Sequence, residues 1–131
     1  MKIDIGLLIL RLTFGGVMLL SHGLPKLMSY SEKAATWADP IGVGPQASLA
    51  LAIFAEAFCS LAVVLGLFTR FAVIPLMVTM FVAFVVVHAA DPWGKKELAF
   101  MYLTAFMVLA ITGPGIYSLD AIKGKLFGKR K

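Results

Sequence analysis

The sequence alternates between long apolar runs and short polar segments. Helices of such lengths, at about 1.5 Å per residue, span the roughly 30 Å hydrocarbon core of a bilayer, and the last run has the least to spare. We therefore predict an all-α membrane protein, a four-transmembrane-helix antiparallel bundle forming a single domain over residues 1–131 and ending in a basic cytoplasmic tail, residues 121–131. The predicted spans cover approximately residues 5–24, 47–68, 71–90 and 97–113.

Glycine and proline mark where the helices are expected to end. Gly23 followed by Pro25 suits a helix C-terminus, because glycine caps helices and proline cannot continue them. Asp91-Pro92 and the segment 113–115 predict the ends of the third and fourth helices in the same way. Each predicted break falls where the bilayer should end.

Two of the connections differ greatly in length. Only Thr69 and Arg70 separate the second and third runs, which predicts a rigid hairpin of neighbouring antiparallel helices. The connection 24–46 is long, and within it a short interfacial helix is expected with Ser31 as its N-cap.

Composition agrees with a membrane protein and excludes several other classes. Of the 131 residues, 60% are hydrophobic and 15% charged, and the mean hydropathy is +0.93. A cytosolic domain or a disordered chain is much more polar. One cysteine, Cys59, excludes a disulfide-rich module, and the net charge of +5 is not arrayed on a polar surface as in nucleic-acid binders.

Basic residues predict the orientation. Four spans place both termini on one side, with seven Lys and Arg residues against four on the other, so both termini are expected in the cytoplasm. The first run is expected to be a retained span, because Arg11 interrupts it and no small-x-small cleavage site follows His22. The excess charge is also expected to contact anionic lipid. The seven are Lys2, Arg70, Lys123, Lys125, Lys129, Arg130 and Lys131, and the four are Lys26, Lys33, Lys95 and Lys96.

Two charged residues fall inside apolar runs, Arg11 in the first and Glu56 in the second. Ionised side chains at bilayer depth are costly unless paired, so both are candidates for function. One interpretation is a buried Arg11–Glu56 ion pair that only fixes the two helices. In another, Arg11 donates hydrogen bonds to an anionic or quinone-like oxygen while Glu56 tunes it, and a third is a proton relay.

The first run carries a line of polar residues. His22 lies eleven residues after Arg11, and eleven steps of about 100° return to within about 20° of the same helix face. Lys26 joins this line if the helix continues past Pro25. The first helix would then present polar groups from mid-membrane to the outer surface.

Two histidines are expected at the same outer level, His22 and His88, which ends the third run. With Glu97 or Asp91 they are candidates for a metal or proton-handling site. The spacing matches no known metal-ligand motif, so no metal is predicted. The alternative is that both histidines simply face lipid headgroups.

The second run also carries small residues spaced alternately by four and three positions, a pattern that lets helices approach closely. Cys59 belongs to this packing seam, which explains it without redox chemistry; thiol chemistry would need a partner's cysteine. No haem, flavin or metal motif is present. The seam comprises Ser48, Ala52, Ala55, Cys59, Ala62 and Gly66.

The order of these motifs resembles the DoxX family of small four-span bacterial membrane proteins. The resemblance implies a four-helix bundle in the inner membrane and an association with redox work, since relatives are described as small subunits of thiosulfate:quinone oxidoreductases or partners of oxidoreductases. It also places the family's polar positions on Arg11, His22, Lys26, Glu56 and His88. The motifs are Leu10-Arg11-Leu12, Gly15-Gly16, His22-Gly23-x-x-Lys26-Leu27, Glu56, Leu65-Gly66-Leu67, Thr69-Arg70, His88, Gly113-Pro114-Gly115 and Ser118-Leu119-Asp120.

These observations favour an inner-membrane accessory or anchor subunit of a redox system, handling quinone or a small sulfur or thiol species through the polar core. Whether it catalyses a reaction itself stays open. The alternative is a non-catalytic structural or assembly protein, and a small transporter is less favoured because four spans are too few for inverted repeats. Partners are expected to be the lipid bilayer and either further copies of the chain or an oxidoreductase, with no nucleic acid.

Overall fold

The computed structural model describes residues 1–128, and all regular structure in this part of the chain is helical. This confirms the predicted all-α membrane fold. Segments labelled η are π-helical turns within longer helices. The elements are α1 (Lys2–Leu10), η1 (Arg11–Gly15), α2 (Gly16–Met18), η2 (Leu19–Gly23), α3 (Leu24–Met28), α4 (Tyr30–Lys33), α5 (Pro45–Ile53), η3 (Phe54–Cys59), α6 (Ser60–Leu65), α7 (Thr69–Val82), η4 (Ala83–Val87), α8 (Trp93–Thr112) and α9 (Leu119–Gly128).

Three continuous helices within residues 1–128 are long and apolar enough to cross a membrane: Lys2–Met28, Pro45–Leu65 and Thr69–Val87. A fourth long helix, α8, has 20 residues and carries three charges near its start. The three helices overlap the first three predicted apolar runs, and α8 overlaps the fourth.

The first helix continues past the predicted stop at Gly23 and Pro25. The prediction was wrong because Pro25 lies in the first turn of α3, directly after the wide turn η2, where its missing N–H interrupts little. Lys26 consequently remains on the first helix. The helix ends at Met28, and the short helix α4 follows with Ser29, not Ser31, as its N-cap.

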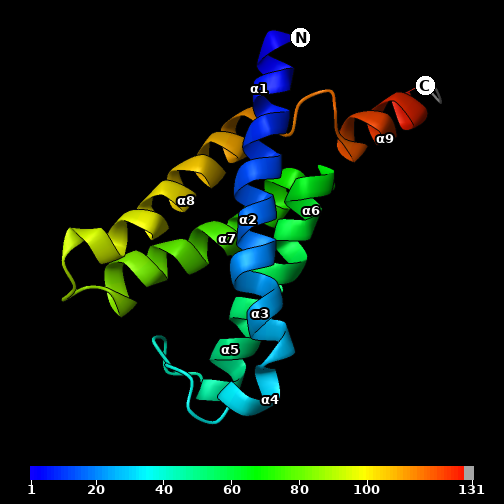
Figure 1. Ribbon diagram of the computed structural model, residues 1–131. Helices are drawn as coiled ribbons and strands as arrows, with labels where there is room; N and C mark the ends of the chain where they lie inside the picture. Colours follow the sequence, from blue (N-terminus) through cyan, green and yellow to red (C-terminus); the bar gives the residue numbers. More distant parts are fainter. Residues whose placement is uncertain (129–131) are drawn as a thin grey trace.

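The long helices form two antiparallel pairs that are steeply inclined to each other (Figure 1). The first helix pairs with α5–α6, and α7 pairs with α8. The second and third spans are antiparallel neighbours as predicted, because α7 contacts both α6 and η3. The hairpin does not extend to their far ends, where α7 and η4 diverge from α5. Thr69 and Arg70 belong to α7, and the turn itself is Gly66–Phe68, with φ of +69° at Gly66.

The core lies where the two pairs meet. Val63, Val73, Leu76, Phe106 and Leu109 are fully buried and bring together α6, α7 and α8. The perimeter carries many exposed large apolar side chains, as expected for a surface in contact with lipid acyl chains. Within the hydrocarbon core of a bilayer, close packing rather than the hydrophobic effect holds helices together.

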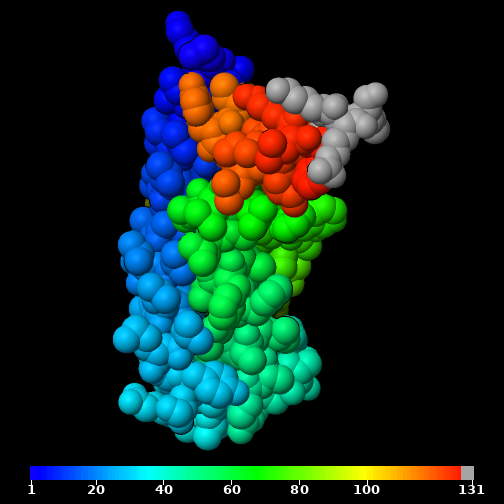
Figure 2. Space-filling view, turned by 90° about the vertical axis from the view of Figure 1, so that its right-hand side faces the viewer, coloured from blue at the N-terminus to red at the C-terminus, as the bar shows by residue number. Residues whose placement is uncertain are grey.

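The chain after α8 packs beside the start of the first helix (Figure 2). Asp120 in α9 accepts hydrogen bonds from the backbone N–H groups of Phe68 and Thr69, at 2.7 and 3.0 Å, and so caps the N-terminus of α7. Lys123 lies over the Phe68 ring, 3.9 Å from its centroid. The remaining basic residues of the predicted tail, Lys129, Arg130 and Lys131, lie outside the described residues.

Candidate functional site

Arg11 is 1% exposed and donates hydrogen bonds to two backbone carbonyls that follow α8. Its Nη1 lies 3.1 Å from the oxygen of Pro114, and its Nη2 lies 2.8 Å from the oxygen of Tyr117. The interpretation that Arg11 pairs with Glu56 is therefore wrong. The first helix meets η3 at Gly23, twelve residues or about 18 Å further along, so Glu56 is out of reach.

Glu56 forms its ion pair with Lys26 instead. Lys26 Nζ lies 2.7 and 2.9 Å from the two carboxylate oxygens of Glu56, whose side chain is only 4% exposed. One turn earlier, the Cα of Gly23 faces the backbone of Glu56 and Ala57, so that a Cβ at this position would overlap both. Glycine at position 23 therefore lets the first helix approach η3 closely enough for the ion pair to form.

A small cavity of about 170 Å³ adjoins this pair. Four of the five predicted polar residues line it, namely His22, Lys26, Glu56 and His88, whereas Arg11 lies elsewhere. The structure adds Tyr102 and Lys95 from α8, which sequence reasoning did not single out. Tyr102 lies edge-on to the His22 ring, with 5.8 Å between centroids.

His88 has a partner outside the cavity as well. Its Nδ1 lies 2.8 Å from a carboxylate oxygen of Asp91, in the turn after η4. This hydrogen bond lowers the pKa of Asp91 below its usual value. Glu97 is exposed on α8, and within residues 1–128 no three His, Cys, Asp or Glu side chains gather as a metal-binding group would require.

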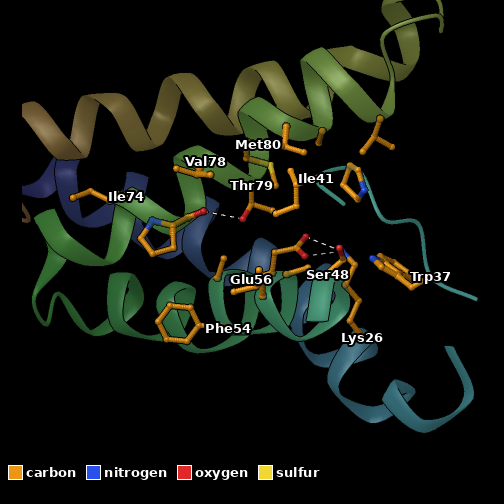
Figure 3. A pocket seen from close by; sticks show the side chains of 18 of the residues that line it. Lys26, Trp37, Ile41, Ser48, Phe54, Glu56, Ile74, Val78, Thr79 and Met80 are labelled. Carbon is orange, nitrogen blue, oxygen red and sulfur yellow. Dashed lines mark hydrogen bonds and ion pairs between the residues drawn. The ribbon is translucent and has the colours of Figure 1, made fainter. Parts of the chain in front are cut away.

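A larger cleft of about 650 Å³ lies on the other side of the ion pair, between α5–η3 and α7–η4 (Figure 3). It exists because α7 diverges from the second helix. Its walls are mostly apolar, and Lys26, Glu56 and His88 supply charged or titratable groups. Trp37 also lines the cleft, with its ring centroid 5.8 Å from Lys26 Nζ.

The small-residue seam of the second helix is divided by this divergence. Cys59 and Ala55 belong to the packed core, and Gly66 lies against Ser118 and Arg11, so the half of the seam near the α6–α7 turn is close-packed. Ser48 and Ala52, in the other half, line the cleft, and Ala55 borders both regions. The small side chains of Ser48 and Ala52 leave room for the cleft.

The mouth of the cleft faces the apolar perimeter. Phe54 and Leu51 on one wall are 51% and 53% exposed, and Ile74 and Val78 on the other are 49% and 57% exposed. Because these four side chains lie on the apolar perimeter of the molecule, the cleft opens toward the surface that lipid covers.

The sequence profile of the DoxX family matches residues 6–89. The chain belongs to the DoxX family. A curated relative, described as the inner membrane protein YqjF of Escherichia coli (strain K12), is 33% identical over 127 residues, covering 93% of this chain and 95% of the relative. No solved structure matches. The protein is accordingly an integral membrane protein that lies in a lipid bilayer.

The polar positions of this DoxX protein fall into two places. Arg11 and the glycine-rich segment after α8 form a structural junction at the end that holds the N-terminus, where Gly66 and Asp120 join it. The remaining polar residues surround the Lys26–Glu56 ion pair, near the end of the first helix and the middle of the second. The two sets, which sequence reasoning treated as one core, therefore have different surroundings.

The DoxX helices widen into π-helical turns beside these residues. Arg11 lies in η1, His22 in η2 and Glu56 in η3, and His88 directly follows η4. Such turns are rare and occur frequently at functional sites, because the extra residue redirects a side chain. Sequence patterns alone gave no signal for them.

Proposed function

We propose that this DoxX protein is an accessory or anchor subunit of a redox system in the bacterial inner membrane, and that it holds a lipophilic molecule of the quinone class in the cleft. The observation that carries the proposal is an apolar cleft open to lipid that ends on a buried Lys26–Glu56 ion pair.

The chemistry of the cleft suits a long apolar molecule with a polar head. Lys26 has three N–H donors, and its two bonds to Glu56 leave one for a carbonyl oxygen of a ligand. The apolar side chains of Ile74 and Val78 on α7 offer contacts for an isoprenoid tail. Ligand sites of this size, mostly apolar with a few polar groups, are typical of small-molecule binding.

The proposal includes an orientation. Both termini are proposed to be cytoplasmic, because four spans place seven Lys and Arg residues of the sequence on the side of the termini and four on the other side. The ion pair and the cleft then lie toward the outer half of the membrane. Association with a second copy or with an oxidoreductase is part of the same proposal.

A non-catalytic structural role is the second candidate. It is supported by the position of the Lys26–Glu56 pair, which joins the first and second helices where they approach most closely. Buried ion pairs often fix the register between helices without contacting a ligand. In this case the cleft would hold only membrane phospholipid.

The two candidates are separated by gentle-detergent purification followed by mass analysis of bound small molecules and proteins. Ala52→Trp fills the cleft, whereas Ala50→Trp, on the exposed face of the same helix, is the matched control. The redox proposal expects quinone with the unmodified protein and Ala50→Trp, and its loss with Ala52→Trp. Phospholipid alone in all three samples, with no oxidoreductase, contradicts the proposal and favours the structural role.

A further inference from the structure

The small cavity lies on the side of the Lys26–Glu56 ion pair that faces away from the cleft. Its 170 Å³ is bordered by several side chains that donate or accept hydrogen bonds, and this volume accommodates several water molecules. Buried polar groups at membrane depth need such partners. The titratable side chains that line it come from four helical elements and the turn after η4, and are His22, Lys26, Glu56, His88, Lys95 and Tyr102.

The ion pair forms the partition between the two spaces. Lys26 and Glu56 line the cleft and also the small cavity, together with Met80, Ala83 and His88. The Glu56 carboxylate therefore borders the apolar cleft open to lipid on one side and the small cavity with its polar side chains on the other. A ligand head group in the cleft and water in the cavity would meet at the same side chain.

The small cavity reaches the molecular surface at the start of α8. Lys95 and Leu98 line it and are exposed there, and this end of α8 lies beside the α7–α8 connection, away from both termini (Figure 1). Trp93 and Lys96 lie on the same turns of α8, where an aqueous boundary is expected. We therefore expect the cavity to open to the aqueous phase at the start of α8.

We propose that the small cavity is a water-filled inlet through which Glu56 exchanges protons between the outer aqueous phase and the head group of the ligand in the cleft. This inference rests on the proposed function for the identity of the ligand. The step is proton exchange alone: the O–H bond of a ligand in its hydroxyl (quinol) form breaks, its proton forms a new O–H bond on the Glu56 carboxylate, and the electron pair stays on the ligand oxygen as an oxyanion that accepts a hydrogen bond from Lys26. The protonated Glu56 then passes the proton to water in the cavity and returns to the carboxylate. No electron is transferred in this step.

Water access is tested by labelling introduced cysteines with a charged, membrane-impermeant thiol reagent. Cys59, the single cysteine, is first replaced by alanine. Ala99→Cys places a thiol on the cavity wall, and Ala105→Cys places one on the same helix at similar burial, 6% against 8%, but away from the cavity. Ser31→Cys, exposed in α4, is the positive control.

The inlet predicts that Ala99→Cys reacts in spheroplasts about tenfold faster than Ala105→Cys, because only a thiol in contact with water forms the reactive thiolate. Equal, slow labelling of both variants overturns the inlet, as does labelling of Ala99→Cys only in inside-out vesicles. Ala83→Cys, also on the cavity wall, replaces Ala99→Cys if that variant does not accumulate.

A separate experiment measures proton exchange at Glu56 through the infrared absorption of protonated carboxyl groups in proteoliposomes. A band that grows as the external pH falls, exchanges with D₂O and is absent from Glu56→Gln supports the inlet; a band unaffected by Glu56→Gln contradicts it. Both tests are independent of ligand retention by the unmodified protein. Failure of the inlet is therefore distinguishable from failure of the proposed function.

Discussion

Gly23 determines how closely the first helix approaches η3, and with it the geometry of the Lys26–Glu56 pair. In Gly23→Ala the new Cβ overlaps the backbone of Glu56 and Ala57, so the helices must separate. We expect a loss of about 1–3 kcal/mol in the free energy of unfolding, typical of overpacking, and weaker retention of a cleft ligand. Thermal unfolding in detergent measures the first effect and mass analysis the second.

Gly16→Ala is the matched control, because Gly16 lies in the same helix and nothing lies within 4 Å of its added Cβ. Alanine is a better helix former than glycine, so this variant is expected to unfold at the same or a higher temperature. Equal unfolding temperatures for the two variants would show that the close approach at Gly23 has no energetic role.

Arg11 holds the junction at the end opposite the cavity. Arg11→Leu leaves the carbonyls of Pro114 and Tyr117 without their donors, which we expect to lower the free energy of unfolding by about 2–4 kcal/mol. Adding Glu56→Leu is expected to give no rescue, because the two side chains do not pair. Unfolding measurements on the single and double variants test this, with Arg70→Leu as the control because its contact to Ile111 is exposed and long at 3.4 Å. Rescue by the second substitution would restore the Arg11–Glu56 interpretation.

The charged residues of the site were predictable, and their partners were not. The cost of burying Arg11 and Glu56 in lipid identified both from sequence, and helical spacing placed His22 and Lys26 on one line. Which residues meet depends on the crossing point at Gly23, which looked like a helix end. A glycine that permits close packing and one that caps a helix are identical in sequence.

Among the helices, α5 has an N-terminus fixed by one carboxylate. Asp39 accepts hydrogen bonds from the hydroxyl of Ser48 and from the backbone N–H groups of Val43 and Gly44, at 2.7 to 2.9 Å. The bond from Ser48, followed by those from the backbone, lowers the pKa of Asp39 below its ordinary value of 3.8. This cap aligns the N-terminal end of α5, where Ser48 lines the cleft.

The sign of the pH effect follows from the lowered pKa. The folded state holds Asp39 ionised more strongly than the unfolded state does, so its stabilisation is present above pH 3.8 and is lost as the pH falls through the lower folded value. We expect Asp39→Ala to lower the unfolding temperature at pH 7 and to differ less from the unmodified protein toward pH 3. Unfolding scans across this range test it; a difference independent of pH would contradict the assignment.

The helices themselves were largely visible in the hydropathy pattern, whereas their pairing was not. The runs starting at residues 47 and 71 correspond to the helices Pro45–Leu65 and Thr69–Val87. The short turn between them predicted a rigid hairpin of neighbouring antiparallel helices. In the structure Gly66 and Phe68 adopt left-handed backbone angles, and α7 leaves the turn toward α8. The cleft forms because α7 turns away from α5, and a pattern of residues within one helix does not predict the direction in which the next helix runs.

For the whole molecule, the distribution of basic residues predicts that both termini face the cytoplasm. A reporter fused after residue 131 is expected to report a cytoplasmic location. The same reporter inserted at Gly42, which is exposed with open space around it, is expected to report the opposite side. Reversed locations would invert the orientation, and the same side for both sites would contradict the pairing of helices seen in the structure.

Photolabelling tests whether the cleft between the two helix pairs binds a lipophilic ligand. A photoreactive quinone is added to membranes containing the protein, and labelled peptides are mapped with and without excess unlabelled quinone. If the ligand binds in the cleft, we expect labelling of both walls, around Ala52 on α5 and Val78 on α7, that excess unlabelled quinone suppresses. This labelling is expected to be lost in Ala52→Trp and kept in Ala50→Trp. Labelling spread over the lipid-facing surfaces, unaffected by competitor or by Ala52→Trp, would contradict it.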